Sequence, residues 1–198
     1  NAPEPMPRPN DLDGAQQFIS GHPAIGTLLG AVRPTPRRSL DELAKAVDDL
    51  WQQTHKGEHS NVSTHLTDLL PDLEQSVRLV DENLRPKTYL LLSRTYQALA
   101  AEFVRQDAAD AAWVAADRAI WAAEQSGDSL HVCAGVYRMV HAFVRLRRLA
   151  QAEHAAQSAI EALETLEGRD ALSVEGLSVL GSLHLMLALV HAGSRQRS

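Results

Sequence analysis

Small and apolar side chains recur along this chain at intervals of three and four residues, the spacing that places them on one face of an α-helix. The pattern is strongest in two segments, 111–120 and 150–160, which repeat each other at a distance of 40 residues. The matching alanines are Ala112, Ala116 and Ala119 in the first segment and Ala152, Ala156 and Ala159 in the second. Because a face of methyl groups lets a neighbouring helix approach closely, this repeated alanine pattern predicts two helical hairpins of similar structure.

The same periodicity predicts an all-α fold, because long segments rich in Ala, Leu, Glu, Gln and Arg alternate with short breaks and no strand-like alternation occurs. Ser39 and Glu42 form a capping-box pair where the first long segment begins. Pro71 interrupts the second segment, which is therefore either two short helices or one kinked helix. Helices are expected near residues 40–56, 60–80, 86–106, 108–126, 129–147, 149–167 and 171–192.

The repeated alanines also predict which residues of the two helices in each hairpin face each other, which we call the repeat register. In a tetratricopeptide repeat, apolar positions of the first helix pack against small positions of the second, and both alanine sets have suitable partners one helix earlier. These partners are Tyr96, Leu99, Ala100 and Phe103 in one hairpin and Val136, Met139, Val140 and Phe143 in the other. We therefore expect antiparallel hairpins stacked as a tetratricopeptide-like α-α superhelix. Its hairpin turns are expected at residues 57, 107, 147 and 193, which leaves only the first helix of the last repeat.

Proline divides the chain into two regions. Seven of the nine prolines lie at or before Pro36, so residues 1–39 are expected to form a Pro-rich linker and residues 40–198 a single helical domain. The segment 11–29 carries enough apolar residues to dock on the domain, although its Gly and Pro residues argue against a regular helix there. The linker is therefore expected to be partly docked.

Charge and composition narrow the possible functions. From Leu40 onward, 15 Lys and Arg stand against 22 Asp and Glu, so this domain is not expected to bind DNA itself. The single cysteine, Cys133, excludes a disulfide framework and a Cys-rich zinc site. No uninterrupted apolar run reaches the roughly 20 residues that span a bilayer. We therefore expect a cytoplasmic protein with no membrane partner.

Four segments carry a family resemblance: AVDDLWQQTHKGEH, LTDLLPDL, LLSRTYQALAAEFVRQ and AWVAADRAIWAAEQSGD. In this order they resemble the C-terminal tetratricopeptide-like region of Cro/repressor-type helix-turn-helix transcriptional regulators from high-GC bacteria, over about residues 40–192. In those regulators a DNA-binding domain precedes a Pro-rich linker and this helical region, which senses a signal or dimerises. The resemblance implies that role here, with DNA bound only through an N-terminal domain that this sequence does not contain.

The repeat register also identifies the side chains expected to face a concave groove. One end of the groove would be aromatic, the middle cationic and the far end apolar. We hypothesise that it binds a peptide or a small amphiphilic anion, whose carboxylate meets the arginines and whose body stacks on an aromatic ring. The candidate residues are Trp51, Arg94, Gln97, Arg105, Tyr137, His141, Arg145, Leu183 and Leu187. The competing interpretation is that these arginines pair with nearby carboxylates and the aromatic residues belong to the core.

Other constellations are weaker. The histidines at 55, 59 and 65 are separated by Gly57, and no HExxH motif or set of carboxylates completes a ligand group, so neither a metal nor another cofactor is expected. No motif for nucleophilic catalysis occurs, and we do not expect an enzyme. Trp113 and Trp121 share a helix face and could wall a pocket, but we expect them in the core.

Two functions from different classes follow from these patterns. The first is a ligand-sensing or dimerisation domain of a transcriptional regulator, with a homodimer formed through the uncovered apolar face of the last helix, at 177–192. The alternative is a free-standing tetratricopeptide-like adaptor that binds a partner protein or peptide.

Overall fold

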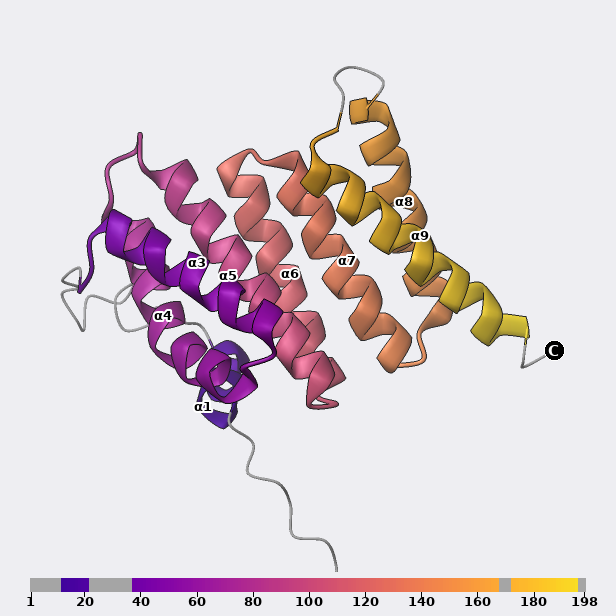
Figure 1. Cartoon of the computed structure of the whole chain (residues 1–198), viewed down its shortest axis with the longest axis horizontal. Coiled ribbons are helices and arrows are strands. Elements are labelled where there is room, and N and C mark those ends of the chain that lie inside the picture. Colours follow the sequence, from indigo (N-terminus) through magenta and orange to yellow (C-terminus); the bar gives the residue numbers. More distant parts are fainter. Residues whose placement is uncertain (1–11, 22–36, 168–171, 196–198) are drawn as a thin grey trace, which may run out of the picture.

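Eight α-helices account for most of the residues that the structure, a computed structural model, describes: 12–21, 37–167 and 172–195 (Figure 1). No strand occurs among these residues, so the prediction of an all-α fold is confirmed for them. The helices are α1 (Asp13–Ser20), α3 (Leu40–Lys56), α4 (His59–Leu79), α5 (Arg85–Arg105), α6 (Ala109–Ser126), α7 (Ser129–Arg145), α8 (Leu149–Glu167) and α9 (Val174–Arg195).

Local sequence signals account for the positions of the helix ends. Ser39 accepts a hydrogen bond from the backbone N–H of Glu42, and the Glu42 carboxylate accepts one from the N–H of Ser39, so the predicted capping box is present at the start of α3. The alternative that Pro71 left open is also settled, because α4 is one helix that runs through this proline.

Four of the connections share one backbone geometry. Residues 57, 107, 127 and 147 each adopt a positive φ, and the N–H group of the next residue returns to a carbonyl in the last turn of the preceding helix. Two of these positions hold glycine, which takes this conformation without strain, whereas Asp107 and Arg147 adopt it with a side chain. Such tight turns make the successive helices antiparallel neighbours.

The turn expected at Gly193 is wrong, because α9 continues through this residue to Arg195. A glycine inside a helix costs only about 1 kcal/mol relative to alanine. Gly193 also lies against α8, since a Cβ atom added there would come within 3.7 Å of Leu149 Cδ1. The hairpin register therefore holds at residues 57, 107 and 147 and fails at its fourth position.

The helices form two rows. In the inner row α3, α5, α7 and α9 contact one another in sequence, whereas α4, α6 and α8 pack against the inner helices without contacting one another. Helix α1 packs against both α4 and α6 (Figure 1). The predicted docking segment therefore places residues 12–21 on the domain, and the rest of residues 1–36 lies outside the described residues.

The two alanine sets lie on buried faces of α6 and α8. All six alanines are at most 4% exposed. The approach of α6 and α7 is tightest at Gly135, where an added Cβ atom would lie 2.8 Å from Ile120 Cγ1 and 3.2 Å from the Ile120 backbone nitrogen. The buried apolar side chains form one cluster that runs from α1 to α6 and includes Ala142 of α7, and a second within α7, α8 and α9.

The expectation that Trp113 and Trp121 belong to the core is wrong. They are 37% and 49% exposed, because the alanine face of α6 points inward and leaves their face on the outer surface. Each packs against an aromatic ring of a neighbouring helix: Trp113 against Phe143 and Trp121 against Tyr89, with ring centroids 6.0 and 5.4 Å apart.

Candidate functional site

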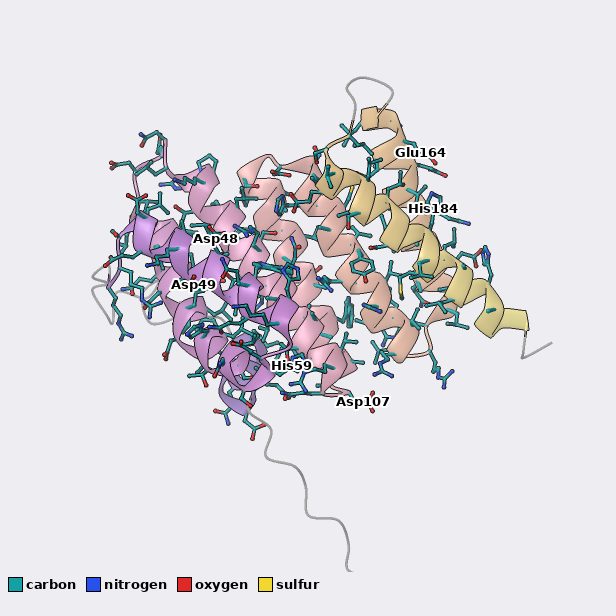
Figure 2. All side chains as sticks on the ribbon, viewed as in Figure 1. Asp48, Asp49, His59, Asp107, Glu164 and His184 are labelled. Carbon is teal, nitrogen blue, oxygen red and sulfur yellow. The ribbon has the colours of Figure 1, made fainter. Side chains whose placement is uncertain are left out.

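The inner row of helices encloses a cleft of about 560 Å³. This volume falls within the range of small-molecule sites, and α3, α5, α7 and α9 all contribute to its walls. Side chains fill much of the space between the ribbons in this region (Figure 2). The lining residues are Trp51, His55, Arg94, Gln97, His131, Tyr137, Arg138, Val174, Glu175, Ser178, Val179 and Ser182.

Four of the nine groove residues predicted from the sequence meet in this cleft: Trp51, Arg94, Gln97 and Tyr137. They come from α3, α5 and α7, so the fold brings together side chains that lie up to 86 positions apart. Gln97 is nearly buried, and its amide nitrogen donates to Ser93 Oγ and to the His131 carbonyl oxygen. These hydrogen bonds fix the amide at the cleft floor.

The other five predicted residues do not line the cleft. They are Arg105, His141, Arg145, Leu183 and Leu187. Leu183 is fully buried in the C-terminal cluster, and Leu187 packs against that cluster. The helical twist of α9 therefore directs its Ser178 and Ser182 toward the cleft instead.

Two of the predicted arginines have carboxylate partners. Arg94 Nη1 lies 2.9 Å from Asp48 Oδ1, and Asp48 projects from α3 (Figure 2). Arg105 Nε lies 2.7 Å from the oxygen Oε2 of Glu102, whose other oxygen is 3.0 Å from His59 Nδ1. The interpretation that the arginines pair with neighbouring acids therefore holds for both.

Arg145 and His141 lie beside the cleft rather than in it. Arg145 donates to the Val104 carbonyl oxygen at 3.4 Å and lines a separate hollow near the turns at 107 and 147. The His141 ring lies 5.3 Å from that of Tyr137, measured between centroids. Burial, together with the charges of Arg138 and Arg145, holds the pKa of His141 below its usual value.

The main cation of the cleft is Arg138, which the sequence reasoning missed. Its guanidinium carbon lies 5.8 Å from the ring centroid of Trp51 and 5.1 Å from that of Tyr137, so it stands between two aromatic walls. No carboxylate among the described residues forms an ion pair with it, and its Nε has no hydrogen-bond acceptor there. Burial lowers the pKa of Arg138, but an arginine retains its charge at any physiological pH.

A second unsatisfied donor lies in the same wall. The Trp51 indole nitrogen is covered and has no acceptor among the described residues. His131, by contrast, has acidic neighbours: its Nδ1 is 3.1 Å from Asp128 Oδ1, and its Nε2 is 4.0 Å from Glu175 Oε1. Among the described residues of the cleft, the buried atoms without a hydrogen-bond partner are the donors Trp51 Nε1 and Arg138 Nε, together with His131 Nδ1, which lies near Asp128 without forming a hydrogen bond.

A smaller hollow of about 380 Å³ lies between α7 and α8. Its lining is mostly apolar and includes Val132, Leu166 and Cys133. Burial raises the pKa of the Cys133 thiol, so this sulfur stays protonated and unreactive near neutral pH.

Two broader properties bear on function. Among the described residues, no group of three or more His, Cys, Asp or Glu side chains is placed to hold a metal ion. Within the same part of the chain one helix, α9, is long and apolar enough over Val174–Gly193 to cross a membrane, on the criteria of length and composition alone.

Comparisons with protein-family models, with curated proteins and with solved structures give no match for this chain.

Proposed function

We propose that this domain is a ligand-sensing module that binds its ligand in the cleft of the inner helix row. The single observation that carries the proposal is the convergence of four helices around the aromatic residues and the unpaired cation of a cleft of about 560 Å³. Concave sites between helices, with an apolar lining and a few polar groups, are frequent ligand sites.

A tetratricopeptide-like superhelix is the finer architecture that we propose for the array. The two rows of antiparallel helices, the turns recurring at 107, 127 and 147, and the buried alanine faces support it. In such arrays the inner row lines the binding surface. The placement of the cleft on α3, α5, α7 and α9 agrees with that arrangement.

The biological setting that we propose is a transcriptional regulator of the helix-turn-helix class, supported by the resemblance of residues 40–192. The alternative is a free-standing adaptor for a partner protein or peptide. Reading the coding region upstream of Asn1 separates the two, because a helix-turn-helix there supports the regulator and a start codon immediately upstream supports the adaptor.

The cleft is tested by filling it. A thermal-shift screen of small acids, amines, neutral aromatic compounds and short peptides is run on the wild type, on Ser182→Trp and on Ser158→Trp. Ser182 lines the cleft, whereas Ser158 is exposed on α8 and serves as the matched control. A ligand at 100 times its Kd stabilises the native state by about 2.7 kcal/mol. We therefore expect cleft ligands to raise the unfolding temperature of the wild type and of Ser158→Trp equally, but not that of Ser182→Trp. Shifts that persist in Ser182→Trp contradict the proposal.

We also propose that the module assembles as a homodimer through the outer face of α9. Leu177, Leu185 and Leu189 are 50–64% exposed on this face, although the opposite face of the helix is buried against α7 and α8. A helix that is apolar on all sides requires cover on all sides. In 22 residues this helix extends about 33 Å, which is long enough for a helix-pair interface.

A second copy of α9 fits this face because a large residue would lie opposite a small one near its centre. In an antiparallel pair centred on residue 183, Leu185 faces Gly181 of the other copy, and Leu177 faces Leu189. Gly181 is exposed, so Leu185 would pack into the space that this glycine leaves, while Leu177 and Leu189 would cover each other.

Light scattering at micromolar concentration tests the dimer. We expect twice the chain mass for the wild type and for Leu84→Glu, which changes an exposed leucine far from α9, and the mass of one chain for Leu185→Glu. A monomeric wild type contradicts the dimer. If it instead floats with lipid vesicles and Leu185→Glu does not, the apolar face serves a membrane.

A further inference from the structure

Within the part of the chain that the structure describes, Arg138 is the arginine of the cleft without a counterion. Arg94 is paired with Asp48, and His131 has Asp128 and Glu175 within 4.0 Å. Among the described residues of the lining, Glu175 is the only one with a carboxylate, and its side chain is 67% exposed. Arg138 therefore stands out in a domain whose overall charge has the opposite sign.

An unpaired cation in a partly desolvated site is costly to maintain. Removing a charge from water carries a penalty of several kcal/mol unless an opposite charge or hydrogen bonds compensate it. The contacts of Arg138 with the Trp51 and Tyr137 rings offset part of this penalty, but neither ring accepts its N–H groups as a carboxylate would. A bound anion would supply the missing partner.

The shape of the site restricts the anion further. The Trp51 and Tyr137 rings flank the guanidinium and offer flat apolar surfaces beside it. The planar fork of an arginine matches the two oxygens of one carboxylate. Glu175 lines the same cleft and would repel a second negative charge, which favours a monoanion over a phosphate dianion.

We propose, on the basis of the function proposed above, that the cleft ligand carries one terminal carboxylate next to a flat apolar group. The carboxylate pairs with Arg138, and the flat group lies against Trp51 and Tyr137. A small aromatic acid and a peptide that ends in an aromatic residue both supply this chemistry, and the experiment distinguishes the two sources.

Isothermal titration calorimetry with matched acids and amides provides the test. The small probes are indole-3-acetate and indole-3-acetamide. The peptide probes are acetyl-Gly-Gly-Trp with a free and with an amidated C-terminus. We expect the acid of the preferred pair to bind at least tenfold more tightly than its amide, and the pair that binds more tightly identifies the source.

Variants assign the effect to Arg138. We expect Arg138→Gln to weaken acid binding at least tenfold and to leave amide binding unchanged, whereas Arg138→Lys, which cannot form the two-pronged contact, loses less. Arg145→Gln is the matched control, because that arginine lies on the same helix but outside the cleft lining, and we expect less than a threefold effect. Circular dichroism and the unfolding midpoint check that each variant is folded.

Each other outcome has a defined meaning. Equal binding of acid and amide to the wild type overturns the carboxylate assignment and leaves the cleft as the binding site. The carboxylate assignment also fails, and the cleft remains the binding site, if no acid binds but Ser182→Trp abolishes the binding of neutral or basic compounds from the screen. An unchanged acid affinity in folded Arg138→Gln also overturns it. If Ser182→Trp blocks no compound at all, the proposed function fails as well.

Discussion

At the scale of single residues, Gly135 sets how closely α6 and α7 approach. A Cβ atom at this position would lie 2.8 Å from Ile120 Cγ1 and 3.2 Å from the Ile120 backbone nitrogen. Because the α6 backbone itself is in the way, we expect Gly135→Ala to lower the free energy of unfolding by about 1–3 kcal/mol, as in overpacked cores. Urea denaturation measures this change.

The matched control for this substitution is Gly14→Ala. An added Cβ atom on this helical glycine of α1 would make only an ordinary van der Waals contact with Thr67 Cγ2, at 3.6 Å, so the change should stabilise the protein by up to about 1 kcal/mol through helix propensity. Opposite signs for the two variants are the expected result. A Gly135→Ala protein as stable as the wild type would show that the two helices can separate at little cost.

His141 makes stability depend on pH. Burial, Arg138 and Arg145 lower its pKa in the folded state, so between that value and the unfolded value of about 6.5 the unfolded chain binds more protons. Stability contributed in this way is present above about pH 6.5 and is lost as the pH falls below it. We therefore expect His141→Gln to flatten the decline of unfolding free energy between about pH 7 and pH 5, as measured by urea denaturation. The same slope in His141→Gln as in the wild type would exclude this role, and exposed His184 (Figure 2) provides the control substitution.

At the scale of elements, Arg118 attaches α1 to the domain. Its Nη2 donates to the carbonyl oxygens of Ile19 and Gly21 at 2.8 and 2.9 Å, and its Nη1 lies 3.4 Å from the Tyr96 hydroxyl. These carbonyls end α1, where a cation is favourable and where backbone acceptors otherwise lack partners. We expect Arg118→Gln to speed amide exchange in residues 13–20 about tenfold, which corresponds to about 1.4 kcal/mol.

Hydrogen exchange followed by mass spectrometry measures the docking of α1, with Arg145→Gln as the control. Arg145 makes one hydrogen bond, of 3.4 Å, to a backbone carbonyl away from α1. Unchanged exchange in residues 13–20 of Arg118→Gln would mean that the buried apolar contacts of α1, such as Ile19, hold it alone.

The ends of the long helices follow from local chemistry, which is why sequence patterns predict each of them to within three residues. The capping box at Ser39 and the glycines at 57 and 127 act within one helical turn. The prediction of a turn at Gly193 failed because the sequence does not distinguish a glycine at a helix end from one inside a helix. Here the packing of Gly193 against α8 favours the helix.

The site was less predictable than the helices because it depends on how far each helix is rotated about its axis. The predicted register correctly placed Trp51 and Tyr137 in the cleft. It assigned the cationic role to Arg94, Arg105 and Arg145, and not to Arg138. One sequence signal for Arg138 existed. Positions 134, 135, 141 and 142, three and four residues away on the same helix, hold no carboxylate to pair with it.

At the scale of the whole molecule, stability should fall from the centre of the array toward α9. Helix α5 contacts α3, α4, α6 and α7, whereas α9 contacts only α7 and α8 and leaves Leu185 64% exposed. In a stacked array each helix is held mainly by its neighbours, and segments with fewer buried contacts open at lower free energy. We therefore expect the slowest amide exchange in α5 and α6 and clearly faster exchange in α9.

The proposed dimer would make this gradient depend on concentration. If a second copy covers α9, exchange in this helix slows as the protein concentration rises, while exchange in α5 stays constant. The Leu185→Glu variant should show fast exchange in α9 at every concentration. The contrary result would be that α9 exchanges as slowly as α5, both in the wild type at high dilution and in Leu185→Glu. The array would then unfold as one cooperative unit, and there would be no stability gradient. In that case the contacts of α9 with α7 and α8 through Leu183, Met186 and Val190 suffice without a partner.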